Sequence, residues 1–191
     1  DSIARERAAV AKYPDEASPH WNLADALSAR GKSASLREAT LEYRTAEHFM
    51  PNAPNIHRSL AALLYKRGLD KDAIDEYQKT IALYPFLSAD HANLGRILKH
   101  DMRLPEALAE LHLAMRLDPR NANVYETLGD LEMIRKNYRQ AAVEYKRSIH
   151  QSYYSLMAWI NLPDALDDSG QYADTIAMGE EADRIVTMQQ Q

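Results

Sequence analysis

The sequence predicts an all-α chain of stacked helical hairpins. Alanine, leucine, glutamate and arginine, which are strong helix formers, are abundant among its 191 residues, whereas strand formers are scarcer. Proline recurs at a fixed interval of 34 residues, at Pro51, Pro85 and Pro119. A fixed period of about 20–50 residues is typical of repeat proteins, in which each hairpin buries its apolar face against the next.

Leucine and alanine keep the same interval. The markers are Leu60, Leu94, Leu128 and Leu162, and Ala39, Ala73, Ala107 and Ala141. Turn signals fall between them at Gly31-Lys32, Gly68-Leu69, Asp101-Met102, Lys136-Asn137 and Gly170-Gln171. The segment NLADAL at 22–27 is nearly repeated as NLPDAL at 161–166, 139 residues later, which is four periods plus three residues. Each unit is therefore expected to be a helix, a tight turn and a second helix.

The units follow one another along a single predicted domain at residues 1–191. Residues 1–16 form the second helix of a truncated unit, which closes at Tyr13-Pro14. Five complete units follow at residues 17–53, 54–87, 88–121, 122–155 and 156–189. The first is three residues longer because its turn is extended near Ser33-Ala34-Ser35.

Several positions agree across the five units. Position four holds His20, His57, His91, Tyr125 and Trp159, and position seven holds leucine in every unit. Position eight holds Ala24, Ala61, Gly95, Gly129 and Pro163. The small residues at this position predict a close approach of two helix backbones. The pattern resembles the tetratricopeptide repeat (TPR) family, whose signature runs W-x2-L-G-x2-Y, then A-x3-F, then P.

The resemblance implies a TPR solenoid, a right-handed α-α superhelix of about five helix-turn-helix repeats plus an N-terminal half repeat. It also implies a concave groove, lined mainly by the first helix of each repeat, that binds a peptide or segment of a partner protein. In this interpretation the chain is a protein–protein interaction scaffold.

Composition excludes several other classes. The chain has 23 basic and 28 acidic residues and a net charge of −5, which argues against a nucleic-acid-binding protein. No apolar run approaches the ~20 residues of a membrane span, so we expect no membrane insertion. The sequence leaves the compartment open, because the absence of cysteine excludes disulfides and thiolate metal sites without fixing the redox environment.

No motif indicates chemistry. The sequence lacks a Gly-rich phosphate loop, G-x-S-x-G, H-E-x-x-H and any cysteine nucleophile, so we predict no enzymatic activity, no cofactor and no metal. Equivalent positions of successive repeats lie roughly 10 Å apart, so His20, His57 and His91 cannot share one ion. We interpret these histidines as half-buried ring fillers, with a pH-responsive stacking role as the alternative.

The resemblance places the groove on positions two, five, six, nine, twelve and thirteen of each first helix. The candidate peptide-binding residues are Asn22, Arg58, Tyr65, Lys66, Asn93, Arg96, Lys99, His100, Glu126, Asp130 and Asn161. We expect the middle of the groove to be basic and its C-terminal end to be acidic. Asn22, Asn93 and Asn161 share position six, as in the asparagine ladder of some TPR arrays, although Ser59 and Thr127 interrupt it. The alternative is that these residues are solvated helix surface.

Pro163 lies where the neighbouring residues are helical. It removes one backbone hydrogen bond and costs about 3 kcal/mol in a helix interior. Three interpretations are open: a tolerated kink in a terminal repeat, a kink that opens a binding pocket beside it, and a helix that ends early and restarts at Pro163.

The C-terminal repeat is expected to contact something else. Its second helix carries Ile176, Ile185 and Met188, and the sequence given has no later helix to cover them. We therefore expect another segment or another chain to cover this end. Since the chain begins with Asp rather than Met, we also expect a piece of a longer protein. The alternative functions are a regulatory or substrate-selecting array of a larger enzyme, for example a glycosyltransferase, and a homotypic assembly module.

Overall fold

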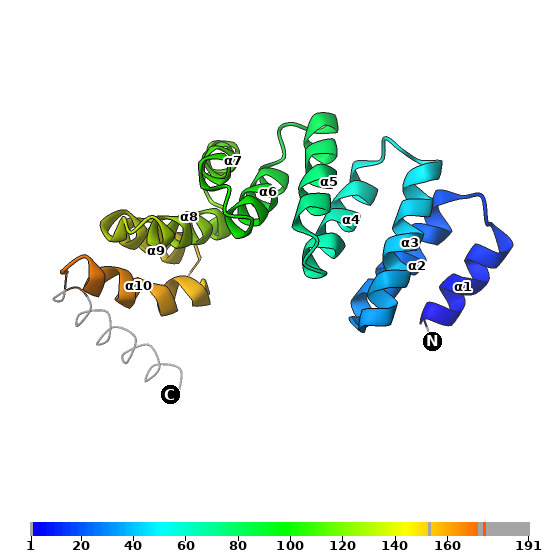
Figure 1. Cartoon of the computed structure of the whole chain (residues 1–191), viewed down its shortest axis with the longest axis horizontal. Helices are drawn as coiled ribbons and strands as arrows, with labels where there is room; N and C mark the ends of the chain where they lie inside the picture. The colour runs from blue at the N-terminus through cyan, green and yellow to red at the C-terminus, as the bar shows by residue number, and fades with distance from the viewer. Residues whose placement is uncertain (1, 153, 172–173, 175–191) are drawn as a thin grey trace. The chain divides into compact units, whose positions relative to one another are not determined.

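The computed structural model describes residues 2–152, 154–171 and 174 (Figure 1). The chain divides into two compact units, Asp1–Ala107 (unit 1) and Leu108–Gln191 (unit 2). The division falls inside helix α7 (Leu104–Leu117). Each unit is described by itself, and the single continuous array expected from the sequence stays a prediction.

Unit 1 consists of helices that pack in chain order. They are α1 (Ser2–Lys12), α2 (Ala17–Arg30), α3 (Ser33–Phe49), α4 (Pro54–Lys66), α5 (Asp70–Leu83), α6 (Ser88–His100) and the start of α7. The closest pairs are the hairpins α2–α3 and α4–α5, and α1 packs on α2, α3 on α4 and α5 on α6. Helices α2, α4 and α6 begin at the predicted repeat starts, which confirms the helix-turn-helix units. The expected extension of the first turn is wrong, because Ser33 already lies in α3, which has 17 residues where α5 has 14.

Unit 2 continues the same pattern with the rest of α7, α8 (Ala122–Ile134), α9 (Tyr138–Gln151) and α10 (Leu156–Asp168). Helices α8 and α9 form a hairpin, and α10 packs on α9. The described parts of both units contain helices and no strand, so the all-α prediction is confirmed. None of the described helices has the length and apolar character needed to cross a membrane.

The tight turns inside the hairpins use left-handed backbone. The φ angle is 72° at Gly31, 73° at Gly68 and 77° at Gly170, and it is 60° at Met102 and Lys136. All five lie at the predicted turn signals. Glycine adopts this conformation at little cost, whereas Met102 and Lys136 adopt it against the preference of L-residues with a Cβ atom.

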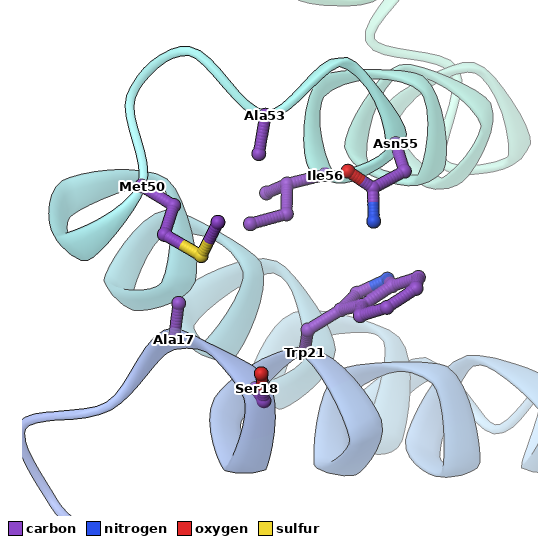
Figure 2. Close-up of a pocket in the computed structure, with 7 residues that line it drawn as sticks. All are labelled: Ala17, Ser18, Trp21, Met50, Ala53, Asn55 and Ile56. Carbon is purple, nitrogen blue, oxygen red and sulfur yellow. The ribbon is translucent and has the colours of Figure 1, made fainter.

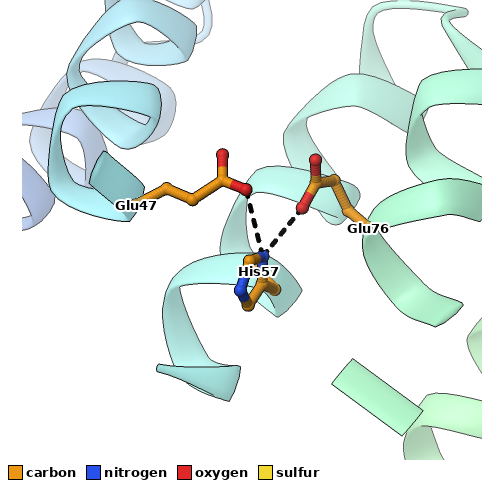
Figure 3. A group of neighbouring side chains, drawn as sticks. All are labelled: Glu47, His57 and Glu76. Carbon is orange, nitrogen blue, oxygen red and sulfur yellow. Dashed lines mark hydrogen bonds and ion pairs between the residues drawn. The ribbon is translucent and has the colours of Figure 1, made fainter. Parts of the chain in front are cut away.

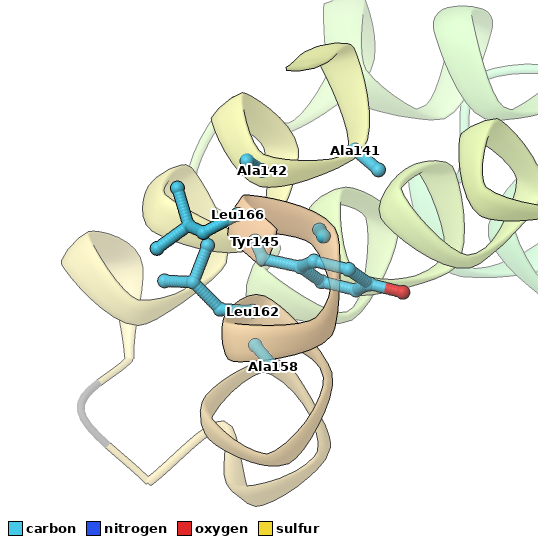
Figure 4. Close-up of a cluster of buried hydrophobic side chains, with 7 residues drawn as sticks. Ala141, Ala142, Tyr145, Ala158, Leu162 and Leu166 are labelled. Atoms are coloured by element: carbon cyan, nitrogen blue, oxygen red, sulfur yellow. The ribbon is translucent and has the colours of Figure 1, made fainter. Parts of the chain in front are cut away.

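Small residues fill the places where helices approach most closely. The alanines Ala24, Ala61, Ala73 and Ala141 are fully buried. Gly129 is under a stronger constraint, because a Cβ atom there would lie 2.5 Å from the ring of Tyr145. In unit 2 this ring lies in a cluster with residues of α9 and α10, namely Ala141, Ala142, Ala158, Leu162, Ala165 and Leu166 (Figure 4).

Helix α10 continues through Pro163, which is half-buried. The interpretation in which a helix ends and restarts at Pro163 is therefore wrong, and the proline lies in a helix interior. The second helix of the last repeat and its uncovered stripe, including Ile176, Ile185 and Met188, lie outside the described residues. The expected cover at that end stays a prediction.

Candidate functional site

Three of the predicted groove residues in unit 1 meet at the C-terminal ends of α4 and α6. The guanidinium of Arg96 lies over the ring of Tyr65, 5.0 Å from its centroid. The ring of His100 meets Tyr65 edge to face, with a centroid distance of 5.8 Å and an interplanar angle of 87°. Arg96 and His100 are four residues apart on α6 and share one helix face, so both reach the last turn of α4. We call Tyr65, Arg96 and His100 the Tyr65 cluster.

The polar partners of the Tyr65 cluster decide which charges remain available. Arg96 donates to Asn93 Oδ1 at 3.2 Å and is otherwise exposed. His100 Nδ1 pairs with the carboxylate of Asp70, so a negative charge already lies beside that ring. Arg96 therefore presents the guanidinium charge of the cluster to solvent.

Arg58, another predicted groove residue, is committed to a different contact. Its Nε and Nη2 donate to the two carboxylate oxygens of Asp90 at 2.6 and 2.7 Å. Asp90 is 0% exposed, so the pair fixes α4 to α6 around a buried carboxylate. The hydrogen bonds to Asp90 raise the pKa of the Arg58 guanidinium. Because its charge is compensated, Arg58 contributes little to a basic surface.

The remaining predicted residues of unit 1 lie apart from these contacts. Lys66 is exposed, with its Nζ 3.4 Å from the carbonyl of Ser28 on α2. Asn22 is exposed on α2, and Lys99 is half-buried on α6. The structure thus brings Tyr65, Arg96, His100 and Asn93 together, with Lys66 on the same turn of α4 as Tyr65.

In unit 2, two predicted groove residues hold a buried tyrosine. Asp130 accepts a hydrogen bond from the Tyr145 hydroxyl at 2.9 Å and another from Asn161 Nδ2 at 3.2 Å. Burial, followed by the charge of Asp130, raises the pKa of Tyr145. Glu126 is half-buried on α8. Asp130 and Asn161 therefore contact side chains of their own unit. We infer no continuous asparagine ladder that includes Asn161.

The histidines at position four are buried rather than half-buried, and they do more than fill space. His20 Nε2 donates to the carbonyl of Pro14 and His57 Nε2 to that of Pro51, both at 2.8 Å. His91 Nε2 repeats the contact with the Pro85 carbonyl at 2.9 Å. The Nδ1 atoms of His20 and His57 contact carboxylates of the second helix, Glu42 at 2.6 Å and Glu76 at 2.8 Å. Each ring therefore ties the loop that precedes its repeat to the hairpin.

His57 also lies in a group with Glu47 and Glu76 whose ligand atoms are all within 4.8 Å of one another (Figure 3). Such a group has the donor types of a metal site. However, Arg44 and Lys79 each pair with both carboxylates. Burial alone would raise the pKa of Glu47, but hydrogen bonds from Lys79 and Arg44 lower it below its usual value. The group is an ion-pair network that joins α3, α4 and α5, and we infer no metal site from it.

A small pocket lies between the start of α2 and the loop that leads into α4 (Figure 2). Its volume is about 80 Å³. The lining is mostly apolar and comprises Ala17, Ser18, Trp21, Met50, Ala53, Asn55 and Ile56. The sequence prediction missed this pocket, although Trp21 and Asn55 occupy positions five and two of their repeats, which the family resemblance assigns to the groove.

Solved structures of TPR proteins share this fold. A tetratricopeptide repeat protein from Parabacteroides merdae matches with a TM-score of 0.79 and 18% identity over 94% of this chain and 70% of its own. MamA from Desulfovibrio magneticus matches with a TM-score of 0.79 and 15% identity over 92% of this chain and 97% of its own. YrrB, described as a TPR protein with an unusual peptide-binding site, matches with a TM-score of 0.70 and 17% identity over 95% and 91%.

Sequence comparison gives no further relatives. No protein-family model matches the chain, and a search of curated proteins gives no match. At these identities the structural matches establish the TPR fold.

Proposed function

We propose that the chain is a protein-interaction scaffold without catalysis of its own, and that unit 1 binds an acidic segment of a partner protein at the Tyr65 cluster. The observation that carries the proposal is the exposed Arg96 guanidinium, which the Tyr65 ring and Asn93 hold in place. A planar guanidinium presents paired N–H donors that match a carboxylate. Because Arg96 is already oriented, it loses little side-chain freedom when a carboxylate binds.

The neighbouring side chains suit the same ligand. Lys66 adds a second exposed cation one residue from Tyr65. The fold supports the proposal, since YrrB, one of its structural neighbours, is described as having a peptide-binding site. Exposed charges are screened over about 8 Å at physiological ionic strength, so we expect binding to weaken as salt is added.

The test is a selection of phage-displayed random peptides on the full chain, followed by fluorescence anisotropy with the enriched peptides. We expect acidic peptides to be enriched. We expect Arg96→Glu to weaken their binding at least about tenfold, equivalent to 1.4 kcal/mol. The matched control is Arg37→Glu, which makes the same change of charge at an exposed residue of α3 in the same unit.

Arg58 is unsuitable for this test, because Arg58→Glu would place a second carboxylate against the buried Asp90 and disturb the fold. A selection that enriches no peptide would refute the proposal. Equal weakening by Arg96→Glu and Arg37→Glu would also refute it, since the effect would then follow net charge alone.

A further inference from the structure

The pocket beside Trp21 contains a polar group that has no partner. The indole nitrogen of Trp21 is buried and makes no hydrogen bond within the described residues. Buried donors are nearly always paired in folded proteins, so an unpaired one at a pocket indicates where an acceptor belongs. The other walls of the pocket are largely apolar, with Ala17, Met50, Ala53 and Ile56 among them.

Asn55 is the amide side chain of this pocket, and it is exposed. Figure 2 shows its amide nitrogen on the side of the Trp21 indole, so that a donor faces a donor. An asparagine amide carries an acceptor and two donors. If the amide turns, its oxygen accepts from the indole and its nitrogen donates outward. If it stays, the indole N–H needs an acceptor from a ligand. In both arrangements the wall presents an N–H donor next to an apolar hollow.

We infer that this pocket binds an apolar side chain of the partner segment, and that the wall formed by Trp21 and Asn55 donates a hydrogen bond to a backbone carbonyl next to that side chain. One water needs about 10–15 Å³ of such space, so about 80 Å³ leaves room for a small apolar side chain, such as valine, leucine or proline. The inference rests on the proposed function and adds an apolar anchor to the acidic one.

Both subsites lie along α4, which fixes their separation. Asn55 is near the N-terminal end of α4 and Tyr65 near its C-terminal end, ten residues later. A rise of 1.5 Å per residue places them about 15 Å apart along the helix. Ala62 lies between them at helical spacing and is exposed, so this part of the helix surface is open. An extended peptide advances about 3.3 Å per residue, so the apolar residue and the acidic residue should be four or five positions apart.

The test uses the peptides enriched on the full chain, and its first readout is their sequence pattern. We expect an apolar residue four or five positions from the acidic residue, in one direction along the peptide. Replacing that residue of the peptide by glycine should weaken binding to the wild-type chain at least about tenfold. Trp21→Phe keeps an aromatic side chain, smaller than indole, and removes the N–H, and it should weaken binding about three- to tenfold. Trp159→Phe, in unit 2, is the matched control and should leave the affinity unchanged.

A second variant guards against loss of folding at Trp21. Asn55→Ala changes an exposed residue, and it should weaken the same peptides while the far-UV circular dichroism and melting temperature stay near those of the wild type. The glycine substitution in the peptide should reduce the affinity less for these two variants than for the wild-type chain. The reason is that the apolar side chain of the peptide and the wall of the pocket contact each other.

The outcomes separate this inference from the proposed function. Peptides that depend on Arg96 but tolerate Trp21→Phe and Asn55→Ala, and that show no apolar residue at this spacing, would overturn the pocket while leaving the acidic site in place. Peptides that do not depend on Arg96 at all would overturn the proposed function first.

Discussion

Gly129→Ala should destabilise unit 2, because it places one methyl group against the buried ring of Tyr145. The added Cβ atom would lie 2.5, 2.6 and 2.9 Å from three ring atoms of Tyr145. Carbon atoms in ordinary contact are about 3.5–4.0 Å apart, so the ring would have to retreat by roughly 1 Å. Tyr145 is 1% exposed, and its hydroxyl donates to Asp130, so this retreat disturbs both packing and a hydrogen bond.

Two effects of opposite sign determine how much Gly129→Ala changes the free energy of unfolding. Overpacking of this kind costs about 1–3 kcal/mol. Replacing glycine by alanine inside a helix contributes about 1 kcal/mol in the stabilising direction. The expected net loss in the free energy of unfolding is therefore about 0–2 kcal/mol, which is too close to zero to be decisive by itself.

A double-mutant cycle with Tyr145→Leu isolates the clash, because leucine lacks the ring and the helix-propensity gain is common to both backgrounds. In the Tyr145→Leu background we expect Gly129→Ala to stabilise unit 2 by about 1 kcal/mol. The coupling free energy between the two substitutions is then about 1–3 kcal/mol. The chain has two tryptophans, so urea unfolding followed by Trp159 fluorescence in a Trp21→Phe background reports on unit 2. A coupling near zero would show that Tyr145 does not pack on Gly129 and would refute this account of position eight.

Three further predictions concern turns, buried charge and pH. Met102→Gly and Lys136→Gly should each raise the free energy of unfolding by about 0.5–1 kcal/mol in urea titrations, since φ is 60° at both sites; a loss at both would contradict the left-handed turns. Arg58→Leu leaves the carboxylate of Asp90 buried and unpaired, so it should cost about 3 kcal/mol or more, and a neutral result would show that the pair is not formed. The pKa of Glu47 is lowered in the folded chain, so its stabilising contribution is present above the unfolded pKa of about 4.3 and is lost as pH falls through the folded value. Unfolding free energies measured from pH 7 down to pH 3 should therefore fall more steeply for the wild type than for Glu47→Gln, and parallel curves would contradict this sign.

The positions of the hairpin turns were predictable because they depend on short-range signals. The 34-residue interval fixes the position of each unit, and glycine or a turn-forming pair marks each hairpin. The positive φ angles at Gly31, Gly68 and Lys136 all fall at those signals. The close approach of two helices at position eight was also predictable, because small residues recur at that position.

The polar contacts between repeats were not predictable from single positions. Arg58 was expected to face a ligand, but it pairs with Asp90, which is 32 residues later in the next repeat. Arg44 pairs with Glu76 across the same interval. In both pairs, side chains of opposite charge on equivalent helices of successive repeats are 32 residues apart, two fewer than the repeat period. A search of the sequence for that interval would have named Asp90 as a candidate partner of Arg58.

The apolar pocket was missed for a different reason. Its lining comes from the start of α2, the loop after α3 and the start of α4, and these residues form no single motif in the sequence. A pocket of this kind depends on how three segments meet. The unpaired nitrogen of Trp21 becomes visible only once that geometry is known.

The most direct measurement is a crystal structure of the full chain with the tightest peptide from the selection. We expect an acidic side chain of the peptide within about 4 Å of the Arg96 guanidinium, the distance of an ion pair. We also expect the peptide backbone to extend along α4 toward Trp21. A peptide bound elsewhere on unit 1, or on unit 2, with the surface around Arg96 and Tyr65 left empty, would contradict the central claim.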